Sequence, residues 1–184
     1  GTGGVAAAYP FIGTNYRVAI IEKNSGLGGV ACLGYVSTWI EGYNTPMLEN
    51  IFTSLKNDGK AFGDFENSWL PTIFSITTGS SLRFDPDAMS DKYENDLSGN
   101  NFNIYYNSAF INYGEVIGNS IKSVVVRSGD STIKLHAKFF VDASTDASLI
   151  RSVNGVRNTD YYYGRDYQSR FNESLAITSG EFRY

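Results

Sequence analysis

The chain begins with glycines whose spacing suits the binding of a phosphate. Gly1 and Gly4 stand where the second and third glycines of the pattern G-x-G-x-x-G would stand, with Thr2 and Gly3 between them. A glycine at the first of these positions lets the backbone approach a pyrophosphate, and a glycine at the second lets a helix pack closely on a strand. Free N–H groups at the start of that helix attract phosphate oxygens. The pattern therefore predicts that residues 1–4 cradle the pyrophosphate of a nucleotide cofactor.

An acidic residue follows at the distance that the same pattern requires. The apolar run Val18–Ile21 is typical of a strand buried on both faces of a parallel sheet, and Glu22 comes directly after it. A carboxylate at this point accepts a hydrogen bond from the 2′-hydroxyl of a ribose. The alternative interpretation is a glycine-rich turn before an ordinary helix, with Glu22 as a solvated strand end.

The composition of the chain limits its function classes. Its 184 residues suffice for one domain, or for one domain and part of a second. The net charge of −4, without a basic patch, argues against nucleic acid as a partner, and no apolar run is long enough for a membrane span. Cys32 is the single cysteine and His136 the single histidine of the chain, which excludes an internal disulfide and a metal site of several histidines. Without a signal peptide we expect a cytoplasmic rather than a secreted protein, although a targeting segment ahead of Gly1 stays open because the chain begins inside a motif.

Hydrophobic patterns and helix signals predict the elements that position these residues. Small residues from 4 to 11 predict a helix packed on a sheet, which Pro10 should end or kink. A second helix is expected over 47–58, where apolar residues recur at helical spacing. Asp85 and Pro86 have the types of the cap and the first residue of a third helix.

The part of the chain after the third helix is rich in strand patterns. Residues 103–119, 120–129 and 131–143 predict three or more strands, with Gly129 and Asp130 supplying unusual backbone angles in the turn between the last two. Residues 138–155 predict a buried strand, a short loop and the start of a helix. The apolar stretch 68–78 is expected to be extended.

Three segments resemble a known family of flavoproteins. Residues 20–40, IIEKNSGLGGVACLGYVSTWI, resemble the part that follows the glycine fingerprint in FAD-dependent oxidoreductases of the glutathione-reductase-like superfamily. The similarity is greatest to a large bacterial family, some of whose members carry the label xanthan lyase. Residues 83–97 resemble the family's helix before the adenine-side strand, and 117–155 resemble its antiparallel crossover and the loop that follows.

The resemblance implies an α/β fold, namely a Rossmann-like FAD/NAD(P)-binding domain with an antiparallel three-stranded crossover, incomplete at its N- and C-termini. This domain would comprise residues 1–39 and 84–155. Residues 40–83 would form a substrate-side insertion, and 156–184 would begin a following segment.

The resemblance also implies contacts with the cofactor beyond the first glycines and Glu22. These fall at Lys23, Gly28, Gly29, Val116, Ala143 and Asp146. The glycine pair would line the path to the flavin, and Val116 would lie on the strand that holds the adenine, unless it is an ordinary core valine. Ala143 and Asp146 belong to a loop in which Thr145 replaces the family's usual glycine.

The function that the resemblance implies is FAD-dependent oxidation or reduction of a small molecule, with the flavin transferring a hydride or electrons. No metal and no catalytic residue are assigned. Two alternatives remain: a dehydrogenase that uses NAD(P) alone, and a non-catalytic carbohydrate-binding or interaction module. The second is suggested by Tyr161–Tyr163, which would stack on sugars or bases or form an edge strand, and it predicts an all-β fold. Arg165 and Arg170 would attract an anionic substrate or lie solvated.

Four further residues allow a chemical and a structural interpretation. Cys32 is either a redox thiol near the flavin or a small buried apolar residue, and the structural interpretation is favoured. His136 is expected at the surface or half-buried rather than in catalysis. Asp142 and Asp146 would pair as acid and base or, as we favour, cap the following turn or helix.

Overall fold

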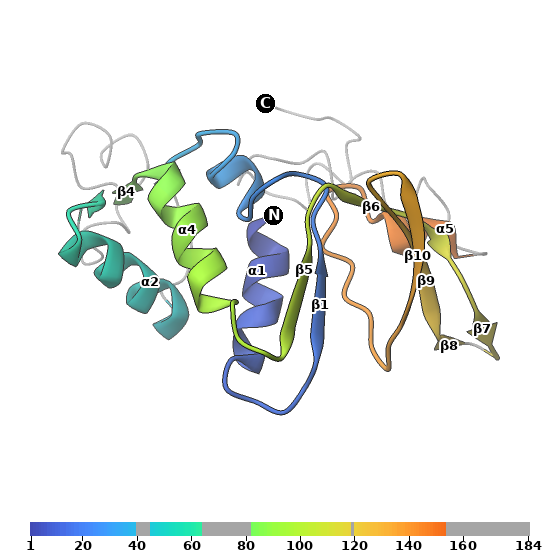
Figure 1. The fold of residues 1–184 in the computed structure, drawn as a ribbon. Helices are drawn as coiled ribbons and strands as arrows, with labels where there is room; N and C mark the ends of the chain where they lie inside the picture. Colours follow the sequence, from blue (N-terminus) through green and yellow to red (C-terminus); the bar gives the residue numbers. More distant parts are fainter. Residues whose placement is uncertain (40–44, 64–81, 119, 154–184) are drawn as a thin grey trace, which may run out of the picture. The chain divides into compact units, whose positions relative to one another are not determined.

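The computed structural model describes residues 1–39, 45–63, 82–118 and 120–153 (Figure 1). The chain divides into two compact units, Gly1–Ser108 and Ala109–Tyr184. The predictions for 68–78, for the tyrosine run and for Arg165 and Arg170 lie outside the described residues.

The first unit is built beside a pair of parallel strands. β1 (Val18–Ile21) pairs with β5 (Phe102–Tyr105), and Val18 lies opposite Phe102. The strand predicted from the apolar run is therefore confirmed. Its burial on both faces is wrong, because Ala19 is exposed: among the described residues β1 pairs with β5 alone, and core residues cover only one face of this pair.

Three helices lie beside this strand pair in the order α1, α4 and α2 (Figure 1). α1 (Thr2–Ala8) passes into a 3₁₀ turn, η1 (Tyr9–Phe11), where Pro10 ends the α-helix as predicted. α2 (Pro46–Asn57) begins at the side chain of Thr45, which accepts from the N–H of Leu48. α4 (Pro86–Asp96) begins at Asp85, whose carboxylate accepts from two backbone N–H groups, so the predicted cap is confirmed.

One hydrophobic core joins these helices to the remaining short elements of the unit. The short elements are the 3₁₀ turn η2 (Gly29–Ala31) and a three-stranded antiparallel sheet in the order β2 (Thr38–Trp39), β4 (Leu82–Phe84) and β3 (Ala61–Phe62). The most buried core side chains are Phe52, Leu27, Met89, Leu97, Val5 and Cys32. The region predicted as an insertion, 40–83, thus contributes α2, β3 and most of β4 to the core of the first unit. These helices are incompatible with an all-β module.

The described residues of the second unit form mainly β-structure. Its larger sheet has the order β10 (Ser131–His136), β9 (Ser123–Ser128) and β6 (Ser108–Tyr113), with β9 and β10 antiparallel. β7 (Val116–Ile117) and β8 (Ser120–Ile121) form a separate antiparallel pair, and α5 (Ser148–Ser152) follows. The predicted strands of this region are confirmed as far as His136.

Two details of the second unit differ from the sequence prediction. Residues 138–141 form no strand, and Phe139 and Val141 are 86% and 69% exposed. A strand needs a neighbour for its backbone groups, and no described strand pairs with this stretch. In the turn between β9 and β10 only Gly129 has a left-handed backbone, with φ 58°, whereas Asp130 does not.

Candidate functional site

Three segments that are distant in the sequence meet at the start of α1. The backbone nitrogen of Gly1 donates to Oε2 of Glu22 at 3.0 Å. On another side, a Cβ placed on Gly29 would lie 2.8 Å from the Cα of Gly1, which is closer than real Cβ contacts allow. The first glycines, the acidic residue after β1 and the glycine pair of the next loop therefore form one constellation within the first unit.

Glu22 is the charged centre of this constellation. It directly follows β1 and is only 6% exposed, so its interpretation as a solvated strand end is wrong. Its Oε1 accepts from the backbone N–H and the side-chain amide of Asn24, both at 2.9 Å. Burial would raise the pKa of Glu22, but the hydrogen bonds from Asn24 and from the nitrogen of Gly1 outweigh it and hold the pKa below its ordinary value. Glu22 is thus a buried, ionised hydrogen-bond acceptor.

The start of α1 offers hydrogen-bond donors, whereas the carboxylate of Glu22 offers acceptors. Gly1 is its N-cap residue, no side chain caps the helix there, and the first intrahelical bond runs from the N–H of Val5 to the carbonyl of Gly1 at 3.2 Å. The preceding N–H groups, from Thr2 to Gly4, have no acceptor within a helix of this geometry. A Cβ on Gly1 or Gly3 would meet no atom within 4 Å, so the space beside these residues is open. An anion has both room and donors here.

The glycine pair forms the third side of the constellation. Gly28 and Gly29 both have left-handed backbones, with φ 98° and 57°, a conformation that glycine adopts without strain. A side chain on Gly28 would overlap the sulfur of Cys32. The segment that follows exposes four apolar side chains, those of Val30, Leu33, Tyr35 and Val36. An apolar surface thus adjoins the polar constellation.

Two residues that sequence reasoning missed hold this loop in place. Asn24 accounts for two of the three hydrogen bonds to the carboxylate of Glu22. The hydroxyl of Ser90, on α4, donates to the carbonyl of Leu27 at 3.0 Å. The position of Asn24, two residues after the acidic residue, is a signal that the sequence offered, since Asn side chains bond locally. No pattern predicts the partner of Ser90, which is 63 residues away.

The remaining predicted cofactor residues are not among the residues that make these contacts. Lys23 is exposed beside Glu22. In the second unit Val116 is 44% exposed on β7, so it is not a core valine. Ala143 is exposed, and the carboxylate of Asp146 accepts from the hydroxyl of Ser148 and pairs with Arg151 at 3.2 Å. Their roles with a cofactor stay predictions.

The residues considered for acid, base or thiol chemistry have surroundings that indicate structural roles instead. Burial raises the pKa of Cys32 to about 11, which agrees with a small buried apolar residue rather than a reactive thiolate. His136 is exposed at the end of β10, as expected. Asp142 accepts from the N–H groups of Leu149 and Ile150 in α5, both at 3.0 Å, so the predicted capping role is confirmed.

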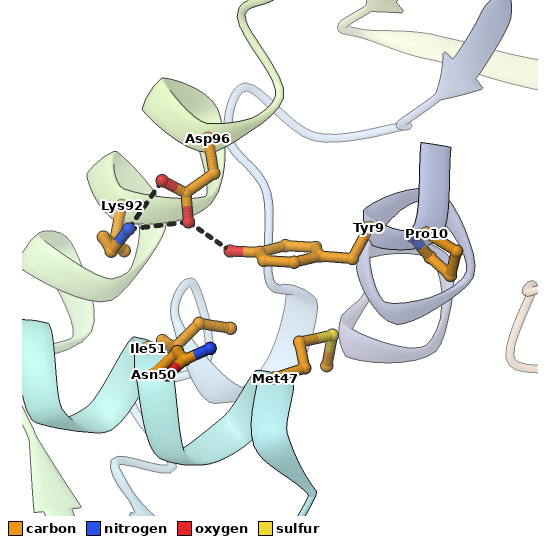
Figure 2. A pocket seen from close by; sticks show the side chains of 7 residues that line it. All are labelled: Tyr9, Pro10, Met47, Asn50, Ile51, Lys92 and Asp96. Atoms are coloured by element: carbon orange, nitrogen blue, oxygen red, sulfur yellow. Dashed lines mark hydrogen bonds and ion pairs between the residues drawn. The ribbon is translucent and has the colours of Figure 1, made fainter. Parts of the chain in front are cut away.

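A pocket opens at the other end of α1 (Figure 2). Its volume is about 340 Å³, and η1, α2 and α4 line it. The Tyr9 hydroxyl donates to Oδ2 of Asp96 at 2.6 Å, and Lys92 reaches the same oxygen at 2.7 Å. Burial, together with this carboxylate, raises the pKa of Tyr9 far above its ordinary value. The polar groups of this wall are therefore bound to one another, and the Lys92–Asp96 pair has the helical spacing that a sequence reveals.

The described residues can be examined for clusters of metal ligands and for membrane-spanning helices. In the described parts of the chain, no three His, Cys, Asp or Glu side chains gather as metal ligands would. None of the helices seen there has the length and apolarity that a membrane crossing requires.

The site itself combines a buried anion, a row of N–H donors and an apolar surface, which together suit a ligand with a diol, phosphates and a ring system.

Comparison with known proteins also indicates a cofactor with these parts. A family model described as FAD dependent oxidoreductase matches residues 1–183. Among solved structures the chain is similar to Thermovibrio ammonificans THI4, with a TM-score of 0.57 and 17% sequence identity over 85% of this chain. At this identity the likeness concerns the fold, which is α/β and Rossmann-like. The chain spans 60% of the length of that structure. No curated protein matches the chain.

Proposed function

Since the chain belongs to the FAD dependent oxidoreductase family, whose cofactor is FAD, we propose that its first unit holds the adenosine and pyrophosphate part of FAD for the oxidation or reduction of a small molecule. Bound FAD supplies the redox chemistry by accepting or donating a hydride or electrons. The protein's own part is to bind and orient the cofactor.

The convergence of Gly1, Glu22 and Gly29 is the observation that carries this proposal. The ionised Glu22 accepts a hydrogen bond from a ribose hydroxyl, because its two oxygens together have more acceptor positions than their three present donors fill. The N–H groups from Thr2 to Gly4 donate to the pyrophosphate, and the open space at Gly1 and Gly3 admits it. The residues present therefore fit the cofactor.

The apolar segment after the glycine pair suits the other half of the cofactor. Val30 and Tyr35 are 70% and 66% exposed, and exposed apolar surface of this kind favours contact with a ring system over contact with water. Gly28 and Gly29 would line the approach to this surface. The resemblance also implies cofactor contacts at Val116, Ala143 and Asp146. No feature of the described residues favours NAD(P) alone as the cofactor.

Absorption spectroscopy of the purified protein tests this function. We expect the protein to be yellow as isolated, or to take up added FAD with the visible spectrum of a bound flavin. The Glu22→Gln variant keeps the shape of the side chain but removes its charge, and we expect FAD affinity to fall at least about tenfold, since hydrogen bonds to a charged group are stronger.

The Asp96→Asn variant is the matched control. Asp96 is also a partly buried carboxylate with several donors, but it lies at the other end of α1. It should keep the affinity of the unaltered protein. A colourless protein that takes up no FAD would overturn the proposal, and an equal loss in both variants would overturn the role of Glu22.

A further inference from the structure

The loop from Asn24 to Gly29 rests against one face of α4. Ser90, Tyr93 and Glu94 lie three and four residues apart and so share that face. A Cβ on Gly26 would lie 3.2 Å from Oγ of Ser90 and 3.6 Å from Oε1 of Glu94. The loop therefore has almost no space between itself and this face of the helix.

The same face fixes the loop where it turns into the left-handed conformation. The carbonyl that accepts from Ser90 belongs to Leu27, the residue immediately before Gly28 and Gly29. Leu27 is 1% exposed, and a Cβ on Gly28 would lie 3.2 Å from the ring of Tyr93. Contacts from α4 thus set the position of both glycines, and Gly29 in turn lies against Gly1.

A second link joins this face to the strand pair. Tyr106 follows β5, and burial together with the nearby carboxylate of Glu94 raises the pKa of its hydroxyl to about 12. The next residues continue the link, because the N–H of Asn107 donates to the carbonyl of Asn24 at 3.1 Å and that of Ser108 to the carbonyl of Glu22 at 3.0 Å. Both ends of the loop are therefore held by contacts outside it.

We propose that the face of α4 formed by Ser90, Tyr93 and Glu94 positions the glycine loop for FAD without touching the cofactor, with the Ser90 hydroxyl as its principal contact. This inference rests on the proposed function and adds positioning residues to it. When the Ser90 bond is lost, the loop spends less time in the conformation that places Gly29 beside Gly1. The apparent dissociation constant for FAD then rises in proportion to the lost population.

Titration of the apoprotein with FAD tests the proposal on variants of Ser90 and of Ser98, which follows the end of α4. We expect Ser90→Ala to weaken FAD binding about fivefold, the order that one net hydrogen bond supplies. Ser90→Thr, which restores the hydroxyl, should recover most of the affinity. Ser98→Ala removes a hydroxyl that bonds only to the carbonyl of Asn95, and this control should leave FAD affinity unchanged.

Tyr106→Phe provides a second, milder variant should Ser90→Ala fail to fold. It removes the hydroxyl that interacts with the carboxylate of Glu94 and should weaken FAD binding about threefold. The visible spectrum of the bound flavin should stay unchanged in all folded variants, because the proposal gives none of these side chains a contact with the flavin. An unaltered FAD dissociation constant in folded Ser90→Ala, or in Tyr106→Phe if Ser90→Ala does not fold, would overturn the proposal. A lack of FAD binding by the unaltered protein would instead overturn the proposed function.

Discussion

The two loops expected to contact the cofactor are held in opposite ways. In the first unit, Glu22 and the glycine pair are held by residues from distant parts of the chain, namely Gly1, Ser90 and Ser108. In the second unit, Asp142 and Asp146 bond within ten residues of themselves, to Ser144, to α5 and to Arg151. A loop held by distant segments depends on the whole unit, whereas a loop with local partners keeps its shape when other parts of the unit change.

Gly29→Ala and Gly129→Ala test this difference most strongly. Both glycines have φ near 58°, so a methyl group strains both backbones equally, by about 1–2 kcal/mol. At Gly29 the methyl would also meet the Cα of Gly1, whereas at Gly129 nothing lies within 4 Å. We expect Gly29→Ala to lower FAD affinity on the order of 100-fold, since a displaced backbone cannot be accommodated by rotating a side chain. Isothermal titration and thermal unfolding measure both effects.

The expected result for Gly129→Ala is a modest loss of stability with unchanged FAD affinity. Equal affinities in the two variants would mean that the contact between Gly29 and Gly1 does not matter for the cofactor.

The pH dependence of stability is the second test. The pKa of Glu22 is lower in the folded protein than its ordinary 4.5, so the folded state favours the carboxylate. Its stabilising contribution is complete above about pH 4.5 and is lost as the pH falls through the folded value. We expect Glu22→Gln to be less stable than the unaltered chain at neutral pH, and this difference to shrink in acid. Urea unfolding at several pH values measures it.

A constant difference at all pH values would contradict the ionised state of Glu22. The mutation Asp146→Asn serves as the comparison, because Asp146 is nearly solvated and its lowered pKa should add little to the pH dependence.

Asp142→Asn tests the local loop. The variant weakens the bonds to the N–H groups of Leu149 and Ile150, and the loss of one capping side chain typically costs about 1 kcal/mol. Amide hydrogen exchange should become faster at these two residues while the amides of β1 keep their protection. Faster exchange in β1 would show that the loop is not independent of the first unit.

His136→Ala should have the smallest effect. His136 is exposed at the end of β10, and surface substitutions of this kind usually change stability by less than about 0.5 kcal/mol. Turnover should stay unchanged. A loss of turnover at full flavin content would give the histidine a catalytic role that its surroundings do not suggest.

Local signals in the sequence predicted the parts of the fold that depend on near neighbours. Asp85 before Pro86 indicated the start of α4, and the apolar run before Glu22 indicated β1, because caps and periodic burial act over a few residues. The expectation failed for 138–141, where an apolar stretch has the composition of a strand but no described neighbour to pair with.

In the candidate site, too, the sequence predicted the residues that depend on local spacing and missed those that depend on packing. The glycine pattern predicted Gly1 and Glu22 because their spacing is fixed within one strand–helix unit. The bond from Ser90 to Leu27 depends on how α4 packs, and no spacing in the sequence reveals it. The resemblance to a flavoprotein family supplied the glycine pair, whose contact with Gly1 only the fold makes visible.

The buried sulfur of Cys32, which lies against the glycine pair, can be used to measure movement of the glycine loop. Cys32 is the only cysteine of the chain, it is 2% exposed, and burial keeps it in the unreactive thiol form near neutral pH. Because the sulfur lies directly against Gly28, a thiol reagent can reach it only when the glycine loop moves away. The rate of alkylation would therefore record how often the loop opens, without an introduced label. If FAD closes the site, that rate should fall in proportion to its occupancy.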